Sequence, residues 1–341
     1  MRIGEFDFEL PEELIAQAAL DDRAGSRMLV VDRVGGGFED RRFREIGEFL
    51  REGDVLVVNN TRVFPARLFG RTSTGASVEV FLVRDAGDGV WETLARPGRR
   101  LAVGKQILFD GGATGEVVEK RDDGRVLVRF DSDVLETAER IGRTPLPPYI
   151  KRDAADADLD RERYQTVYAR ERGSIAAPTA GLHFTPEVLD AIRDTGVTVA
   201  EATLHVGYGT FEPVRVDELS EHSVSPEVYE IDAATAELLN TAQADGRRIV
   251  AVGTTTTRAL ETNLARFGRF TEGVHEADLT IVPGHAFRAV DALLTNFHLP
   301  QSSLLVLVST FGGHELIMRA YRHAVAAKYR FYSYGDCMLI E

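Results

Sequence analysis

Cysteine is almost absent from this sequence. Cys337 is the only one in 341 residues, so the chain can form no internal disulfide and no metal site built from clustered thiolates. Long hydrophobic runs are lacking too, because stretches such as SLLVLVSTF are far shorter than the ~18–20 apolar residues of a membrane span. The start, MRIGEFDFELPEEL, has neither the basic nor the apolar segment of a signal peptide. We therefore expect a cytoplasmic protein without membrane contacts.

Basic residues are clearly fewer than acidic residues in this chain. It has 40 Lys and Arg against 54 Asp and Glu, a net charge of −14, so binding to nucleic acid would require a local basic surface. Residues 60–130 differ from the rest because they hold 12 basic and 9 acidic residues. Arg96, Arg99, Arg100 and Lys105 cluster within them. This cluster is either a candidate RNA contact or an ordinary solvated rim.

Hydrophobic patterning divides the chain into two kinds of segment. RMLVVDR and DVLVVNN are continuous apolar runs, which are typical of strands buried on both faces of a mostly parallel sheet. Between residues 62 and 148, short alternating stretches are separated by Gly-containing turns, a pattern typical of a small antiparallel barrel. We predict a mixed, mostly parallel α/β catalytic domain from residues 1–61 and 149–341, interrupted by an inserted antiparallel β-barrel domain from residues 62–148.

Within the α/β segments, strand-like and helical patterns alternate. PEELIAQAAL, residues 11–20, predicts a short helix with Pro11 at its start. The run SLLVLVSTF at 303–311 fits a strand or a buried helix equally well. Further helices are expected over 186–196, 233–246, 256–268 and 314–329, and strands over 197–206, 247–253 and 292–297.

Four predicted strands end in polar or Gly-rich loops: VVNNTR, TLHVGYGTF, VAVGTTTTR and LLTNFHLP. In open α/β sheets, ligands bind at the carboxyl ends of strands. A helix that begins near Thr256 or Thr257 would offer free N–H groups to an anion, and Arg258 would add a guanidinium fork. The alternative is a capped helix beside a surface arginine. Asn59 and Asn60 could likewise recognise a base or an amide, or only satisfy a hinge.

Three histidines, His183, His205 and His298, lie between apolar residues and beside such loops. Their separations of 22 and 93 residues lack the close spacing of a typical zinc site. An imidazole in a partly apolar site suits general acid–base catalysis. For each histidine singly, an ordinary buried ring with a hydrogen bond remains an equal alternative.

Longer motifs resemble a known family over nearly the whole chain. LPEELIAQ, NNTRVFPARLFG, PLPPYI, YQTVYA, AAPTAGLHFT, TLHVGYGTFEPVRV, AVGTTTTRALE, VDALLTNFHLPQSSLLVLVS and YRFYSYGDCMLI occur in the order found in the S-adenosylmethionine:tRNA ribosyltransferase-isomerase family. The resemblance implies an α/β domain with an inserted barrel. It also implies transfer and isomerisation of the ribosyl moiety of S-adenosylmethionine onto 7-aminomethyl-7-deazaguanine at the tRNA wobble position. Epoxyqueuosine forms, and adenine and methionine leave.

The same resemblance implies the partners and suggests roles for residues. S-adenosylmethionine is consumed as a substrate, no cofactor or metal is expected, and the chain would act on the modified tRNA as a monomer. His183 and His205 are candidates for base and acid, and Asp336 for pairing with the aminomethyl ammonium. The expected substrate-binding residues are Asn59, Asn60, Arg62, Thr179, Gly181, Gly207, Gly209, Thr210, Thr254, Thr255, Arg258, Asn296 and His298. Because the chain is acidic overall, the tRNA is expected to meet the basic cluster of the barrel and its exit, namely Arg96, Arg99, Arg100, Lys105, Lys151 and Arg152.

The sequence departs from the family pattern at three places. Ser225-Pro226 stands where a His-Ser pair is usual, Val282 replaces a tyrosine, and Thr256-Thr257 replaces Ser-Val. These changes are either drift or altered substrate detail. Two other functions stay open: a tRNA-binding module without catalysis, which would release no adenine, and a metal-dependent hydrolase, which would contain stoichiometric zinc.

Overall fold

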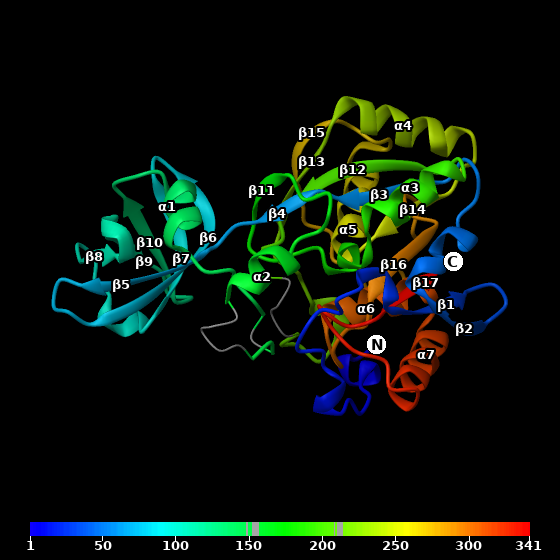
Figure 1. The fold of residues 1–341 in the computed structure, drawn as a ribbon, viewed down its shortest axis with the longest axis horizontal. Coiled ribbons are helices and arrows are strands. Elements are labelled where there is room, and N and C mark those ends of the chain that lie inside the picture. Colours follow the sequence, from blue (N-terminus) through cyan, green and yellow to red (C-terminus); the bar gives the residue numbers. More distant parts are fainter. Residues whose placement is uncertain (148, 152–156, 208, 210–213) are drawn as a thin grey trace.

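The computed structural model describes residues 1–147, 149–151, 157–207, 209 and 214–341. Figure 1 shows a small barrel on the left and a larger α/β body on the right, joined by the extended chain around β4 (Thr61–Val63). The fold class predicted from the sequence is confirmed. Nowhere in these described ranges is a helix both long and apolar enough to cross a membrane.

A nine-stranded sheet forms the centre of the larger body. Its order is β15-β13-β12-β3-β14-β16-β17-β1-β2, and β12, β3, β14 and β16 are parallel neighbours. The carboxyl ends of these four strands therefore lie at one edge, as the loop pattern predicted. β17 runs antiparallel to β16 and parallel to β1, so both strands begin at that same edge. The bounds are β1 Arg27–Asp32, β2 Gly37–Arg42, β3 Val55–Asn59, β12 Thr198–Leu204, β13 Glu227–Ile231, β14 Ile249–Val252, β15 Gly273–Ala277, β16 Ala292–Asn296 and β17 Cys337–Ile340.

Helices cover both faces of the sheet, which explains why its central strands are apolar throughout. One core contains side chains from α4 (Ala233–Ala244), α5 (Thr254–Phe267), α6 (Ser303–Gly312) and α7 (His314–Ala326). The other core contains side chains from α3 (Pro186–Asp194) and the 3-10 turn Phe43–Phe49. A short α2 (Ala157–Arg163) lies outside these layers.

The smaller body is a closed barrel with strand order β10-β7-β6-β5-β8-β9, and every neighbouring pair is antiparallel. Its core includes Trp91, which packs edge-on against Phe64. α1 (Val134–Ile141) packs against this core through Val134 and Ala138. The barrel strands are β5 Arg67–Thr72, β6 Ser77–Gly87, β7 Val90–Arg96, β8 Gln106–Phe109, β9 Thr114–Lys120 and β10 Arg125–Phe130. Outside the barrel, β4 pairs with β11 (Glu171–Ser174).

Two local predictions were wrong. The helix expected over 11–20 is only a 3-10 turn at Glu12–Leu14, because Leu14 and Ala16 exchange backbone hydrogen bonds with Phe331 instead of forming helical ones. The helix expected from Thr256 begins two residues earlier, with Gly253 as its N-cap. The ambiguous run at 303–311 is helical, and its N-cap hydroxyl, on Ser302, accepts from the N–H of Leu305.

Candidate functional site

A cavity that is partly open to solvent lies where the parallel strands end. Ligands of open α/β sheets bind at this edge. Segments that are far apart in the sequence meet around the cavity: the start of α5, the residues after β16, the residues before β17, and the chain leaving the barrel. Its lining consists of Tyr149, Tyr164, Ala176, Ala177, Pro178, Thr179, Ala180, Val206, Gly253, Thr254, Thr255, Thr295, Asn296, Phe297, His298, Leu304, Tyr332 and Ser333.

The N-terminus of α5 opens into this cavity. Gly253 has φ of +93°, a backbone conformation that L side chains rarely adopt, so glycine allows the sharp turn from β14 into the helix. The hydroxyls of Thr256 and Thr257 bond back to the carbonyls of Val252 and Gly253, at 2.7 and 3.1 Å. Thr254 and Thr255 line the cavity. The first backbone N–H groups of any helix have no hydrogen-bond partner within that helix. This end of the cavity is therefore suited to an anion.

Arg258 on the same helix is turned away from the cavity. Its guanidinium forms a buried ion pair with Glu227 at 2.7 Å and donates to the carbonyls of Ser225 and Ala277. Its positive charge is thus matched within the protein. The carboxylate-binding role that we predicted for Arg258 stays a prediction, and the geometry favours the helix N-terminus for it.

His298 is the one of the three candidate histidines that lines the cavity. Its Nε2 lies 2.9 Å from the Thr295 hydroxyl, and its backbone N–H donates to the Tyr321 hydroxyl oxygen. Burial lowers the pKa of His298 to about 3. The imidazole is therefore neutral at pH 7 and can accept a hydrogen bond.

His183 reaches the cavity only through Asn296. The Asn296 amide nitrogen donates to the carbonyls of Tyr332 and Ser333, at 2.8 and 3.4 Å, so its oxygen is the acceptor from His183 Nε2, at 3.3 Å. Nδ1 lies 2.9 Å from the Ser26 hydroxyl oxygen. Burial lowers the pKa of His183 to about 4, so the ring is neutral and both of its nitrogens are occupied.

Asp336 also bonds the ends of the loop that carries Tyr332 and Ser333. Its carboxylate accepts from the backbone N–H of Arg27 at 2.9 Å and of Arg330 at 2.8 Å. Burial raises the pKa of this carboxyl. Asp336 does not line the cavity, but it fixes the ends of the loop that carries Tyr332. Tyr332 has φ of +75°, a strained conformation for a residue other than glycine, so the loop is held in place by its neighbours.

Three tyrosines form an aromatic wall that sequence reasoning missed. Tyr149 packs edge-on against Tyr332 and bonds its hydroxyl to that of Ser333. The buried Tyr164 hydroxyl makes no hydrogen bond to a described residue, although Ser333 and the Ala177 backbone lie near enough to lower its pKa. Burial raises the pKa of all three, to about 12 for Tyr332, so they are protonated donors at neutral pH. The motifs PLPPYI, YQTVYA and YRFYSYGD contain them, but buried tyrosines are too common to single out.

Comparison with known proteins connects this geometry to a family. A family model described as a queuosine biosynthesis protein matches residues 3–340. The chain belongs to this family. Relatives from Solibacter usitatus, Syntrophotalea carbinolica and Thermotoga maritima are 53%, 51% and 47% identical, with both chains fully covered. All three are named S-adenosylmethionine:tRNA ribosyltransferase-isomerase.

A solved structure supports the same assignment. The crystal structure of S-adenosylmethionine tRNA ribosyltransferase from Thermotoga maritima matches with a TM-score of 0.57 and 38% identity, covering 99% of this chain and 100% of that one. The family and the enzyme class that the motifs indicated are confirmed.

Other residues that the family motifs suggested do not line the cavity. His205 Nδ1 lies 2.8 Å from the Thr61 hydroxyl, and its ring sits so close to Gly173 that a Cβ there would come within 2.7 Å. Burial lowers the pKa of His205, although Glu171 opposes the shift. Asn59 exchanges hydrogen bonds with the Leu204 backbone, so it joins the ends of β3 and β12.

The remaining predicted residues lie in varied surroundings. Asn60 bonds Thr203 and Glu201, Gly207 donates its N–H to Glu227, and Gly181 lies against the Tyr168 hydroxyl. Of the substrate set, Thr179, Thr254, Thr255, Asn296 and His298 line the cavity, Arg62 is exposed on β4, Gly209 lies against Ser225, and Thr210 falls outside the described residues. Among the predicted tRNA-binding residues, three are exposed and one is half-buried: Arg96, Arg99 and Lys151 are exposed, and Lys105 is half-buried. Arg152 and the side chain of Arg100 lie outside the described part of the chain.

The structure offers no support for a zinc site. Among the described residues, no three His, Cys, Asp or Glu side chains come together to hold a metal. His183 and His205 do not line the cavity that His298 faces. The hydrolase alternative therefore has no metal centre in the described part of the chain.

Proposed function

We propose that this cavity transfers and isomerises the ribosyl moiety of S-adenosylmethionine onto 7-aminomethyl-7-deazaguanine at the wobble position of tRNA. Epoxyqueuosine is the product, and adenine and methionine are released. The observation that carries the proposal is that one cavity joins a helix N-terminus to a wall of protonated tyrosines, within a chain of this family. S-adenosylmethionine is a consumed substrate, and no cofactor is required. The enzyme acts as a cytoplasmic monomer.

The two ends of the cavity suit different parts of the substrate. The methionine carboxylate binds the N–H groups at the start of α5, where the helix dipole favours negative charge. Aromatic rings pack well against flat nucleobases, so Tyr149 and Tyr332 are placed to hold adenine or the deazaguanine. Adenine leaves more easily when a ring nitrogen accepts a hydrogen bond, and the protonated tyrosine hydroxyls are the donors at this wall.

The three histidines have different parts in this proposal. His298 is a neutral imidazole at the cavity, and because its pKa of about 3 makes it a weak base, we assign it to hold a ribose hydroxyl by a hydrogen bond. His183 and Asp336 act through the loop that carries Tyr332, and we assign them as positioning residues. His205 keeps its predicted acid–base role only if substrate binding brings the sugar within its reach.

Adenine release tests this proposal. The purified chain is incubated with S-adenosylmethionine and either tRNA bearing 7-aminomethyl-7-deazaguanine or the same tRNA with guanine at that position. We expect adenine only with the modified tRNA. Tight binding of modified tRNA without adenine release would instead indicate a non-catalytic module. Stoichiometric zinc by elemental analysis, with activity lost on chelation, would favour the hydrolase.

A further inference from the structure

One carboxylate is buried on the outside of the barrel. Along β7, Trp91 belongs to the barrel core, and side chains alternate between the two faces of a strand, so Glu92 points outward. An outward glutamate is normally solvated, yet the Glu92 side chain is only 3% exposed. Something must cover it, because a buried charge without partners is costly.

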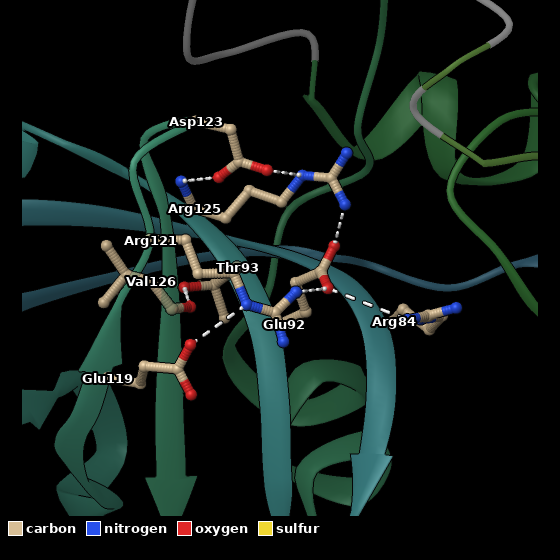
Figure 2. A network of polar contacts seen from close by, with 8 residues as sticks. All are labelled: Arg84, Glu92, Thr93, Glu119, Arg121, Asp123, Arg125 and Val126. Atoms are coloured by element: carbon tan, nitrogen blue, oxygen red, sulfur yellow. Dashed lines mark hydrogen bonds and ion pairs between the residues drawn. The ribbon is translucent and has the colours of Figure 1, made fainter. Parts of the chain in front are cut away.

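Three arginines cover Glu92, as Figure 2 shows: Arg84 from β6, Arg125 from β10, and Arg121 from the turn between β9 and β10. Arg121 approaches one carboxylate oxygen at 2.7 Å and Arg125 the other at 2.5 Å. Arg84, directly opposite Glu92 on β6, lies 3.9 Å away. Guanidinium groups from both sides of β7 therefore meet at the Glu92 carboxylate.

The arginines are held firmly and still face solvent. Arg121 and Arg125 are each held a second time through Nε, by Glu119 and Asp123 at 3.2 Å. Their side chains nevertheless remain 37% and 36% exposed, and that of Arg84 is 62% exposed. Guanidinium groups fixed in this way lose little freedom when they bind an anion, and their planar forks match phosphate oxygens.

Two unpaired arginines extend this surface. Arg129 lies on the same outward side of β10 as Arg125, and Arg96 lies on the same side of β7 as Glu92, by strand alternation. Both are exposed, and no ion pair to either occurs among the described residues, although Glu79 and Glu116 lie opposite them on the neighbouring strands. Together with Arg84, Arg121 and Arg125 they form what we call the barrel arginine face.

The charge of the molecule limits what this face can bind. Residues 60–130 carry three more basic than acidic residues in a chain whose net charge is −14, so the rest of the chain is strongly acidic. A polyanion is repelled by the α/β body and can approach only a local basic surface. The exposed acids Glu119 and Asp123 are the groups that an incoming phosphate would displace, whereas Glu92 stays buried.

We propose that the barrel arginine face binds the sugar–phosphate backbone of the substrate tRNA. This assignment rests on the proposed function for the identity of the RNA. It differs from the basic stretch expected from the sequence, with which it shares only Arg96. The sequence could not reveal it, because these arginines come together only when β6, β7, β10 and β9 pair in the barrel.

Charge reversal at the unpaired arginines tests the face without disturbing Glu92. We compare Arg96→Glu/Arg129→Glu with a control pair on the α/β body, Arg269→Glu/Arg322→Glu, whose arginines are also exposed without ion pairs among the described residues. Both pairs change the net charge equally. We expect the barrel pair to raise the Kd for tRNA about tenfold or more and to reduce the salt slope by roughly 1.4–1.8, the value for two lost phosphate contacts. The control pair should change the Kd less than threefold.

A second variant tests the organised arginines themselves. Glu92→Gln/Arg121→Gln/Arg125→Gln removes the buried charge together with its two closest partners and leaves Arg84, so no unpaired carboxylate remains at position 92. We expect a higher KM for tRNA and an unchanged KM for S-adenosylmethionine. Equal effects of the barrel and control pairs, or no effect of the barrel pair, would overturn the proposal. Adenine release by the unaltered enzyme separates the two proposals: if it is absent while the barrel pair still loses RNA binding, the reaction is wrong and the face is right.

Discussion

At the scale of single residues, histidines with similar sequence neighbours differ in which groups their ring nitrogens contact. His298 faces the cavity, whereas His183 uses both nitrogens to connect Ser26 with Asn296. For each histidine a buried ring was one of two equal alternatives, and the structure buries His183 and His298. Their hydrogen-bond partners include Asn296 and Tyr321, which come from other segments of the chain. The loops after the parallel strands therefore lie at one edge as the sequence indicated, whereas the function of each side chain stays a prediction.

This difference predicts how His183 variants behave. His183→Ala should lower kcat about 10- to 100-fold, because Asn296 loses its donor and no longer fixes the Tyr332 loop. His183→Gln, whose amide can still donate, should recover most of that loss. Because the pKa of His183 is about 4, the pH dependence of kcat between 5 and 8 should be the same in the Gln variant as in the unaltered enzyme. A general base would behave differently: both variants would lose ~10²–10⁴-fold, and a limb of the pH profile would vanish.

At the scale of elements, the strands and helices with strong periodicity could be predicted, and the irregular segments could not. α3, α4, α7, β12 and β16 lie where the hydrophobic pattern placed them. The segment 11–20 failed because pairing with Phe331, more than 300 residues away, replaced its local hydrogen bonds. The loop before β17 was equally hidden, since its shape depends on Asp336 and Asn296.

The strained loop gives a prediction that separates stability from binding. Tyr332→Gly should leave the free energy of unfolding unchanged within about 1 kcal/mol, because relief of the left-handed strain offsets the lost packing. It should raise the KM for S-adenosylmethionine at least tenfold, because the variant loses an aromatic ring from the cavity wall. Lys328→Gly is the matched control, since Lys328 also has positive φ and is exposed. A KM that rises equally in both variants would show that backbone freedom, rather than the ring, matters.

At the scale of the whole molecule, the sequence indicated two bodies because two kinds of pattern occupy separate stretches of chain. The structure places the barrel core and the two cores of the large sheet in separate clusters. The sequence could not show which residues near the barrel line the cavity or which barrel residues form a common surface. The cavity receives Tyr149 and Tyr164 from the chain just after the barrel, while the barrel arginines gather across strands.

Separate cores predict separate unfolding transitions. Trp91 is the only tryptophan and lies in the barrel core, so its fluorescence reports the barrel alone, whereas far-UV circular dichroism reports the whole chain. We expect the two signals to have different midpoints in urea, because two-state behaviour fails when domains unfold independently. S-adenosylmethionine at ~100 times its Kd should stabilise the α/β body by about 2.7 kcal/mol and leave the Trp91 transition in place. Coincident transitions that both shift with the ligand would mean that the barrel and the sheet unfold as one unit, and that the segments joining them couple the arginine face to the cavity.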